Sequence, residues 1–202
     1  MEVHQAAARL KQGDVKGLEV LTRTYYLQAV RTAYLIVQDQ ALAEDVTQTS
    51  LVNLFTKIEQ FDETREFRPW FLRIVVNNAI SACRKLEKNI SLDDDREYSE
   101  TLAALERLSE NGRGPEDDYI SAENRQVVWQ ALEQLTPQQR AAVVLRYYLE
   151  LSENEIEQEL KRPKSTIKWA LFSARRKLRQ LLKPLHSDDD QPEVVPTNKE
   201  RI

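Results

Sequence analysis

The chain is poor in the residue types that build disulfides, metal sites and phosphate-binding loops. Its 202 residues include one cysteine, two histidines and four glycines. A single cysteine excludes an internal disulfide and cannot build a typical zinc cluster, and no glycine-rich phosphate loop is present. We therefore expect a protein that is not an enzyme, with no catalytic residue, no metal and no cofactor.

Long apolar runs are also missing. No stretch approaches the roughly 20 apolar residues that a membrane span requires. The start, Met-Glu-Val-His, lacks the basic and apolar segments of an export signal. We expect a cytoplasmic protein with no membrane contact of its own.

Strand signals are equally scarce. No run alternates apolar and polar residues long enough to demand a strand, whereas Leu, Ala, Glu, Gln and Arg are plentiful. The sequence therefore predicts an all-α fold of two small helical bundles joined by an acidic linker, the C-terminal bundle containing a helix-turn-helix. The expected parts are an N-terminal domain (1–88), a flexible linker (89–122), a C-terminal domain (123–185) and a disordered acidic tail (186–202).

Charge is distributed unevenly along a chain whose net charge is only −4. Residues 123–185 contain twelve basic and seven acidic residues, whereas residues 89–122 contain three basic and ten acidic ones. Concentrated basic charge in one domain is typical of a nucleic-acid-binding surface. The alternative interpretation is that these basic residues form an ordinary solvated helix face.

The N-terminal domain shows helical spacing of apolar residues in three segments. One helix is expected from Asp14 to a break at Asp39, and a second over 41–60, with Leu51, Leu54, Phe55 and Ile58 on its buried face. A loop over 61–68 precedes the third helix, 69–86, in which Pro69 suits the first turn. Phe71, Ile74, Val75 and Asn78 are expected to be buried there.

The C-terminal domain opens with a helix near Ala122 whose predicted buried face contains Val128, Leu132 and Leu135. Thr136-Pro137 with Gln139 predicts a capping box at the start of the next helix. Its core is expected to continue with Ala141, Val144, Leu145 and Tyr148.

Residues 152–183 have the pattern of a helix-turn-helix. Ser152 followed by Glu155 is a second capping box, and Pro163 must end the short helix that follows. Ile167, Leu171, Ala174, Leu178 and Leu181 then form one apolar stripe, and the other face is basic, with no acidic residue. A helix of this kind fits the major groove of DNA.

Two separated blocks carry a resemblance to a known family. The first is Ala43-Glu44-Asp45-Val46-Thr47-Gln48, Phe61-Asp62, Phe67-Arg68-Pro69-Trp70-Phe71-Leu72-Arg73-Ile74 and Asn77. The second is Leu135-Thr136-Pro137-Gln138-Gln139-Arg140, Leu145-Arg146-Tyr147, Leu151-Ser152, Glu155-Ile156 and Ser165-Thr166-Ile167-Lys168. In this order they resemble conserved regions two and four of the extracytoplasmic-function (ECF) sigma factors of the sigma-70 family.

The resemblance implies a subunit that binds core RNA polymerase and promoter DNA, duplex and single-stranded, and directs promoter recognition, DNA melting and transcription initiation. By family habit it also implies an anti-sigma partner. Implied polymerase contacts are Glu44, Asp45 and Gln48. Implied contacts to the minus-ten element are Phe61, Arg65, Phe67, Arg68, Trp70, Arg73, Asn77 and Arg84. Implied contacts to the minus-thirty-five element are Lys164, Ser165, Thr166, Lys168, Trp169, Arg175 and Arg176.

The chain departs from the family pattern in its second block. Lys161 and Ser165 stand where relatives usually have glycine, and Trp169-Ala170 stands where a Ser-Arg pair is common. We expect the fold to tolerate these departures, but they affect which DNA sequence the C-terminal domain prefers.

Several alternatives stay open at this point. An autonomous helix-turn-helix regulator would bind duplex DNA without polymerase, and a related possibility is a regulatory protein that keeps the fold but has lost initiation activity. Residues 89–122 either thread the polymerase RNA channel or form a solvated tether. The acidic tail is a candidate screen for the basic helix in the free protein.

Overall fold

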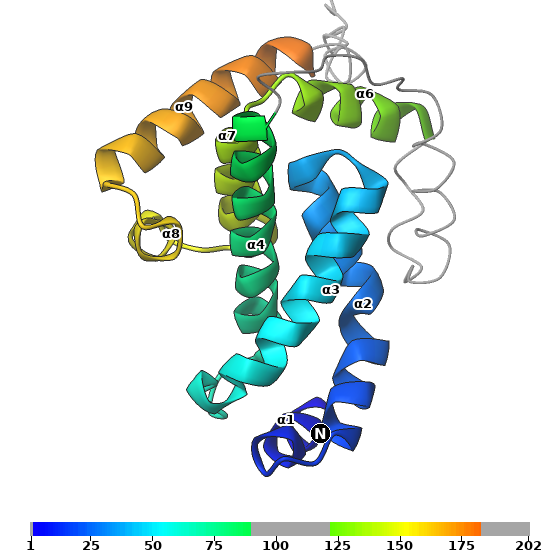
Figure 1. Ribbon diagram of the computed structural model, residues 1–202. Helices are drawn as coiled ribbons and strands as arrows, with labels where there is room; N and C mark the ends of the chain where they lie inside the picture. Colours follow the sequence, from blue (N-terminus) through cyan, green and yellow to red (C-terminus); the bar gives the residue numbers. More distant parts are fainter. Residues whose placement is uncertain (1, 90–121, 183–202) are drawn as a thin grey trace, which may run out of the picture.

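The computed structural model describes residues 2–89 and 122–182, and every regular element in these two ranges is helical (Figure 1). The all-α prediction is confirmed. The predicted tail, and the predicted linker apart from its two end residues, lie outside the described residues, so the hypotheses about them stay untested.

The N-terminal bundle is built around one long helix, α2, which packs against the other three (Figure 1). Its helices are α1 (Glu2–Lys11), α2 (Lys16–Val37), α3 (Gln40–Lys57, extended by a 3-10 turn over Ile58–Gln60) and α4 (Phe67–Asn89). Helix α1 was not among the helices expected from the sequence. It also placed the start of α4 two residues too late, because Pro69 lies inside the first turn, where a missing N–H is tolerated.

The predicted break between α2 and α3 is confirmed at residues 38 and 39. Gln38 adopts the left-handed conformation that ends α2, with φ 58° and ψ 27°. Asp39 then caps α3, since its side chain accepts a hydrogen bond from the Leu42 N–H at 2.8 Å. A left-handed residue followed by a capping carboxylate gives a sharp turn, which lets α3 fold back along α2.

The C-terminal bundle contains α6 (Ala122–Glu133), α7 (Pro137–Val143, continued by a π-helical turn over Val144–Tyr148), α8 (Glu153–Leu160) and α9 (Lys164–Leu181). Both predicted capping boxes are present, at Thr136 and at Ser152. Helices α8 and α9 form the predicted helix-turn-helix, and α9 also packs against α6 and α7.

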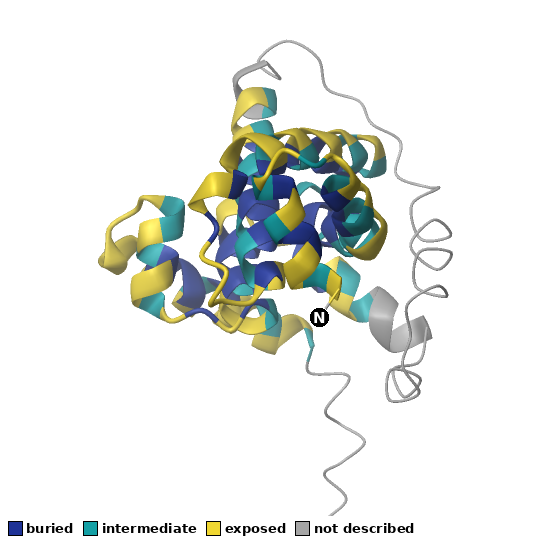
Figure 2. Ribbon diagram, turned by 90° about the horizontal axis from the view of Figure 1, so that it is seen from below, coloured by how far each residue is buried: buried dark blue, intermediate teal, exposed yellow. Residues whose placement is uncertain are grey.

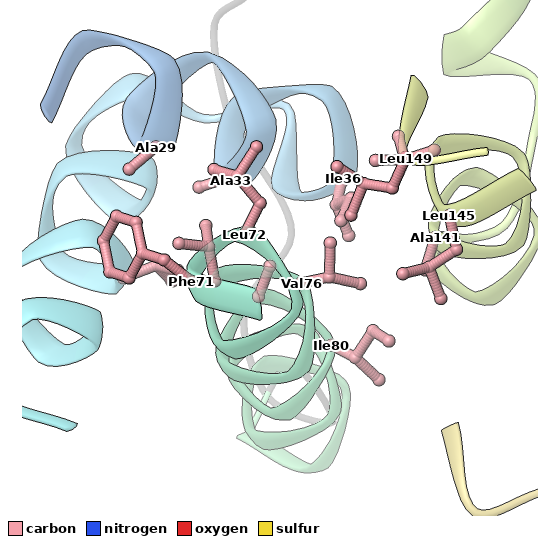
Figure 3. Close-up of a cluster of buried hydrophobic side chains, with 14 of the residues drawn as sticks. Ala29, Ala33, Ile36, Phe71, Leu72, Val76, Ile80, Ala141, Leu145 and Leu149 are labelled. Carbon is pink, nitrogen blue, oxygen red and sulfur yellow. The ribbon is translucent and has the colours of Figure 1, made fainter. Parts of the chain in front are cut away.

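The two bundles share one apolar core (Figure 3). Ile36 of α2 and Val76 and Ile80 of α4 lie opposite Ala141 and Leu145 of the C-terminal bundle. Each of these five side chains is buried, so the boundary between the bundles excludes water as a domain interior does.

Polar and aromatic contacts strengthen this boundary. Arg140 is 6% exposed, and its Nε donates to the Ile36 carbonyl at 2.7 Å while Nη1 donates to the Leu135 carbonyl at 2.6 Å. The rings of Tyr34 and Trp129 stack with centroids 4.5 Å apart. A buried guanidinium that satisfies carbonyls of both bundles fixes their relative position, because separating them would leave buried polar groups unpaired.

Buried residues lie between the helices and exposed ones on their outer sides (Figure 2). Three apolar residues predicted to be buried are instead exposed. Phe55 is 48% exposed because α3 turns the side containing Leu54 and Ile58 inward. Val128 is 39% exposed because α6 turns Trp129 toward Tyr34, and Leu181 is 39% exposed in the last turn of α9. Asn78 is half-buried, where it donates to Ser50 Oγ at 2.9 Å.

Candidate nucleic-acid and polymerase interface

The loop between the 3-10 turn and α4 is held by its own polar side chains. The carboxylate of Asp62 accepts hydrogen bonds from Thr64 N–H at 3.0 Å and Thr64 Oγ1 at 2.7 Å, which lower the pKa of Asp62 below its ordinary value. Arg65 Nε lies 3.4 Å from Asp62, and Lys11 of α1 binds Glu63 at 3.0 Å. These contacts give the loop a defined shape beside the start of α4.

Two aromatic residues expected to contact DNA are buried instead. The side chains of Phe61 and Phe67 are each 2% exposed, and their rings pack edge to face with centroids 5.3 Å apart. They anchor the loop to the core, so neither ring offers a free face to a base. Their assignment to the minus-ten element stays a prediction, and their burial depends on helix packing that residue type alone did not reveal.

Trp70 supplies the aromatic surface that remains in this region. It is half-buried against Phe61 and Phe67, at centroid distances of 5.1 and 5.7 Å. Beside it lies a pocket of about 180 Å³ whose lining includes Arg65 and Arg73. The lining also includes Phe61 and the carboxylates of Asp62 and Glu66. The pocket thus combines aromatic surface with two guanidinium groups, the chemistry that holds an unstacked base and its phosphate, and with two acidic groups that partly balance their charge.

Arg73 and Asn77 lie one turn apart on α4, and both reach the same carboxylate of α8. Arg73 Nη1 is 3.3 Å from Glu159 Oε1, and Asn77 Nδ2 donates to Glu159 Oε2 at 3.3 Å. Arg73 Nη2 is also 3.5 Å from Glu155 Oε1. Arg73 and Asn77 thus share one acidic partner, a pairing that the sequence did not reveal.

The other two basic residues predicted on α4 lie at opposite ends of the helix. Arg68 stacks over the Tyr148 ring at 5.4 Å and, with the Gln28 amide oriented toward it, donates through Nε to Gln28 Oε1 at 2.7 Å. Arg84 is exposed and lines a narrow pocket together with Arg162 and Thr166. The structure thus does not gather all of the predicted minus-ten residues on one open surface.

Helix α9 presents the predicted basic face to solvent. Ile167, Leu171 and Ala174 are buried against the rest of the bundle, as the apolar stripe predicts. The predicted minus-thirty-five residues are all exposed, and they are Lys164, Ser165, Thr166, Lys168, Trp169, Arg175 and Arg176. Trp169 is 66% exposed, and Phe172, which the set did not include, is 60% exposed.

Helix α8 differs sharply from α9 in charge, since it contains four glutamates and no basic residue. Its capping box is complete: Ser152 Oγ accepts from the Glu155 N–H at 3.3 Å, and Glu155 accepts from the Ser152 N–H at 2.9 Å. The Ser152 N–H and the Ser152 hydroxyl, which also donates to Glu155 Oε2 at 2.8 Å, lower the pKa of the Glu155 carboxyl, with a smaller contribution from Arg73. Glu155 therefore stays ionised where it faces α4.

Lys161 ends α8 in the left-handed conformation, with φ 49° and ψ 47°. Glycine, which the family resemblance implies at this position, adopts the conformation without a steric penalty. We expect Lys161→Gly to raise the free energy of unfolding by about 1 kcal/mol, measured by urea denaturation followed by circular dichroism. Lys161→Ala, which keeps the Cβ, is the control, and a glycine variant no more stable than the alanine variant would contradict the prediction.

Helix α3 carries a mixed polar and apolar surface that we call the α3 face, formed by Asp45, Gln48, Val52 and Phe55. All four are exposed, and their spacing places them on one side of the helix. Val52 is 66% exposed and was not among the polymerase contacts expected from the sequence. Glu44, the third predicted polymerase contact, is half-buried and accepts from Gln40 Nε2 at 3.1 Å.

None of the described helices is long and apolar enough to cross a membrane. Within 2–89 and 122–182, no group of His, Cys, Asp and Glu side chains is arranged to hold a metal ion.

Two family descriptions match the two bundles in the expected order. Sigma-70 region 2 matches residues 21–89, and Sigma-70, region 4 matches residues 125–178. Together they span more than half of the sequence, and they coincide with the loop, α4 and the helix-turn-helix described above. The chain therefore belongs to the ECF sigma factors of the sigma-70 family.

Similar proteins in three bacteria match over nearly the whole chain. The ECF RNA polymerase sigma factor SigW of Bacillus subtilis is 28% identical over 185 residues, covering 92% of this chain and 99% of SigW. The RNA polymerase sigma-H factor of Pseudomonas aeruginosa is 26% identical, with coverage of 90% and 94%. The ECF RNA polymerase sigma-E factor of Escherichia coli K12 is 27% identical, with coverage of 88% and 92%.

Two solved structures share the fold. CnrH, solved in complex with the cytosolic domain of CnrY, superposes with a TM-score of 0.54 at 20% identity, covering 94% of this chain and 99% of CnrH. The sigma factor RpoE of Bartonella quintana, solved with the anti-sigma factor NepR, gives a TM-score of 0.57 at 22% identity, with coverage of 81% and 96%.

Proposed function

We propose that this chain docks on core RNA polymerase through the α3 face and directs promoter recognition, DNA melting and transcription initiation, without catalytic chemistry of its own. The observation that carries the proposal is the presence of two exposed surfaces of different chemistry on one chain. The α3 face is acidic and apolar, whereas the outer face of α9 is basic. An autonomous duplex-binding regulator would require only the second surface.

The α3 face fits a protein partner better than a nucleic acid. Val52 and Phe55 expose apolar area beside Asp45. The sequence from Asp45 to Phe55 contains no basic residue. Exposed aromatic and aliphatic side chains rimmed by polar groups are typical of protein interfaces. We assign Asp45, Gln48, Val52 and Phe55 to polymerase binding, with Glu44 at the edge.

The pocket beside Trp70 and the adjoining face of α4 fit the minus-ten element in single-stranded form. Melting exposes unstacked bases, which bind to aromatic surfaces while basic side chains track the backbone. Trp70 supplies aromatic surface, and Arg65 and Arg73 supply donors within the pocket. Arg68 and Asn77 lie on α4 outside its lining. Arg84, farther along α4, extends the basic track.

Helix α9 fits the minus-thirty-five element as duplex. In a helix-turn-helix the first turns of the second helix reach base edges in the major groove, and basic residues contact phosphates. Lys164, Ser165 and Thr166 occupy the first turn, and Arg175 and Arg176 lie farther along. Trp169 adds an apolar surface that suits thymine methyl groups.

An anti-sigma protein is the second proposed partner. One structural relative was solved with an anti-sigma factor, and the other with the cytosolic domain of CnrY. We place the protein in the cytoplasm, where polymerase and promoter DNA are found.

Polymerase binding tests the proposal most simply. Purified chain mixed with core bacterial RNA polymerase is expected to co-elute from a size-exclusion column as a stoichiometric complex. If the chain elutes alone while it binds duplex DNA without polymerase, the autonomous regulator becomes the better interpretation.

A further inference from the structure

Helix α1 packs beside the loop that forms the pocket next to Trp70. It contacts the 3-10 turn Ile58–Gln60, which leads into the loop, and α4, which follows the loop (Figure 1). Ala6, Ala7 and Leu10 of α1 are buried in the apolar core. Sigma-70 region 2 matches this chain from residue 21 onward, so α1 is a support for the loop that lies before the matched region.

The position of α1 is set by a close crossing with α2. Gly17 of α2 is buried, and a Cβ there would collide with the Ala6 carbonyl oxygen and the Leu10 backbone nitrogen. The absence of a side chain lets the two backbones approach this closely. Asp14 holds the connection between the helices, because its side chain accepts a hydrogen bond from the Lys16 N–H at 3.0 Å. Helix α1 is therefore firmly placed relative to the bundle.

The last turn of α1 contains the residue that reaches the loop. Lys11 Nζ lies 3.0 Å from Glu63 Oε1, and the Lys11 side chain is only 21% exposed, so its aliphatic stem lies along the bundle surface. Asp62, Arg65 and Glu66 line the pocket, whereas Glu63 turns to α1. The loop is thus held by α1 on one side while its other side chains line the pocket.

This ion pair acts on the part of the loop that the core does not hold. The two ends of the loop are fixed by the buried rings of Phe61 and Phe67. Between them, the contacts of Asp62 lie within the loop, so they shape it without attaching it to a helix. The pair of Lys11 and Glu63 attaches the middle of the loop to α1.

The charge of Lys11 also acts on a residue of the pocket wall. Two hydrogen bonds from Thr64 are the main cause of the lowered pKa of Asp62, and the charges of Arg65 and Lys11 add smaller contributions. Asp62 is part of the pocket lining. Lys11 therefore influences the pocket in two ways, through its charge and through the position of the loop.

We propose that Lys11 is a positioning residue for the minus-ten element, because its ion pair with Glu63 holds the loop in the shape with which the pocket discriminates among bases. The inference rests on the proposed assignment of this pocket to single-stranded DNA. An extruded base is recognised by hydrogen bonds and stacking, both of which depend on geometry. A loop that can shift holds the correct base less well and accepts a wrong base more readily. Lys11 acts through Glu63, without contact to the strand.

Promoter opening by core RNA polymerase with the full chain tests the inference. The probes are a genomic promoter fragment that the unaltered chain melts and copies in which each base of the minus-ten element is replaced in turn. Permanganate reactivity of thymines follows the rate of opening. Lys11→Met keeps an aliphatic stem and removes the charge. We expect it to lower the ratio of opening rates, parent fragment to replaced fragment, by about threefold, the scale of a partly exposed ion pair. Co-elution with polymerase should be unchanged.

Two further variants separate positioning from a loss of positive charge. Arg9→Met removes a charge from the same helix, where Arg9 pairs with Asp14 at 3.4 Å, and should leave the ratio unchanged. Lys11→Glu/Glu63→Lys reverses the ion pair and should restore the discrimination that Lys11→Glu alone loses. An unchanged ratio in Lys11→Met, an equal loss in Arg9→Met, or no recovery in the reversed pair would overturn the inference.

Hydrogen exchange of the loop amides separates this inference from the proposed function. The Thr64 and Arg65 N–H groups are hydrogen-bonded within the loop, and Lys11→Met should speed their exchange in the free chain by about threefold. A chain that melts no promoter with polymerase would lose the proposed function and the minus-ten role of Lys11, while faster exchange would still show that Lys11 braces the loop. A chain that melts promoters but shows neither change in Lys11→Met would lose the positioning role alone.

Discussion

Val52→Glu/Phe55→Glu is expected to lower the affinity of the chain for core RNA polymerase by at least about 100-fold, because each substitution places an unpaired charge in a desolvated contact. Two such losses of about 1.4 kcal/mol each correspond to this factor. The fold should be unaffected, since both side chains already face solvent. Titration of labelled chain with polymerase, followed by anisotropy, measures the affinity.

Val15→Glu is the matched control for this prediction. Val15 is 61% exposed and precedes α2, outside the α3 face, so the same chemical change there should leave polymerase binding intact. If the control lost as much affinity for polymerase as the double variant, or if the double variant kept the affinity of the unaltered chain, the α3 face would not be the docking surface.

The second large effect concerns the basic face of α9. Lys168→Ala/Arg175→Ala/Arg176→Ala is expected to weaken binding to promoter duplex by about three orders of magnitude at low salt. Each phosphate contact contributes about 0.9 to the slope of log affinity against log salt, so the slope should fall by about 2.7. The slope is obtained by measuring the affinity for duplex DNA at several salt concentrations between roughly 50 and 200 mM, where phosphate contacts contribute strongly to binding.

A control variant removes three exposed basic residues from the N-terminal bundle. Lys16→Ala/Arg23→Ala/Lys57→Ala has the same net charge as the α9 variant, but these positions lie on α2 and α3. For this variant, the slope of log affinity against log salt should equal that of the unaltered chain. If both variants lost slope equally, binding would depend on net charge, and α9 would have no special part in it.

Local sequence patterns predicted the helices well because the forces that set helix limits act over a few residues. Ser152 with Glu155 and Thr136 with Gln139 are pairs three residues apart, and both capping boxes are present. The apolar stripe of α9 likewise follows from spacing alone. The acidic and basic faces of the helix-turn-helix could be read from the sequence for the same reason.

Local sequence patterns could not predict contacts between residues that lie far apart in the sequence. Arg73 and Glu159 are 86 residues apart, and no spacing rule connects them. Predicting that α8 lies on α4 would require the packing of the two bundles, which depends on the shared core around Ile36 and Leu145. The burial of Phe67 and the exposure of Phe55 depend on tertiary packing in the same way.

The departure at Lys161 was visible in the sequence, and the structure gives it a physical meaning. The residue has a positive φ, so the strain that glycine would avoid is present at the turn of the helix-turn-helix. Trp169 is another departure, and its exposure beside the basic residues places it where it can alter the preference for a DNA sequence.

Permanganate footprinting of genomic promoter fragments, with core polymerase and the purified chain added separately and together, shows whether this chain directs promoter melting. The account predicts reactive thymines near the transcription start only when both proteins are present, because polymerase supplies the platform and α4 holds the melted strand. Duplex binding without melting, in the presence of a polymerase shown to be active with another sigma factor, would contradict it.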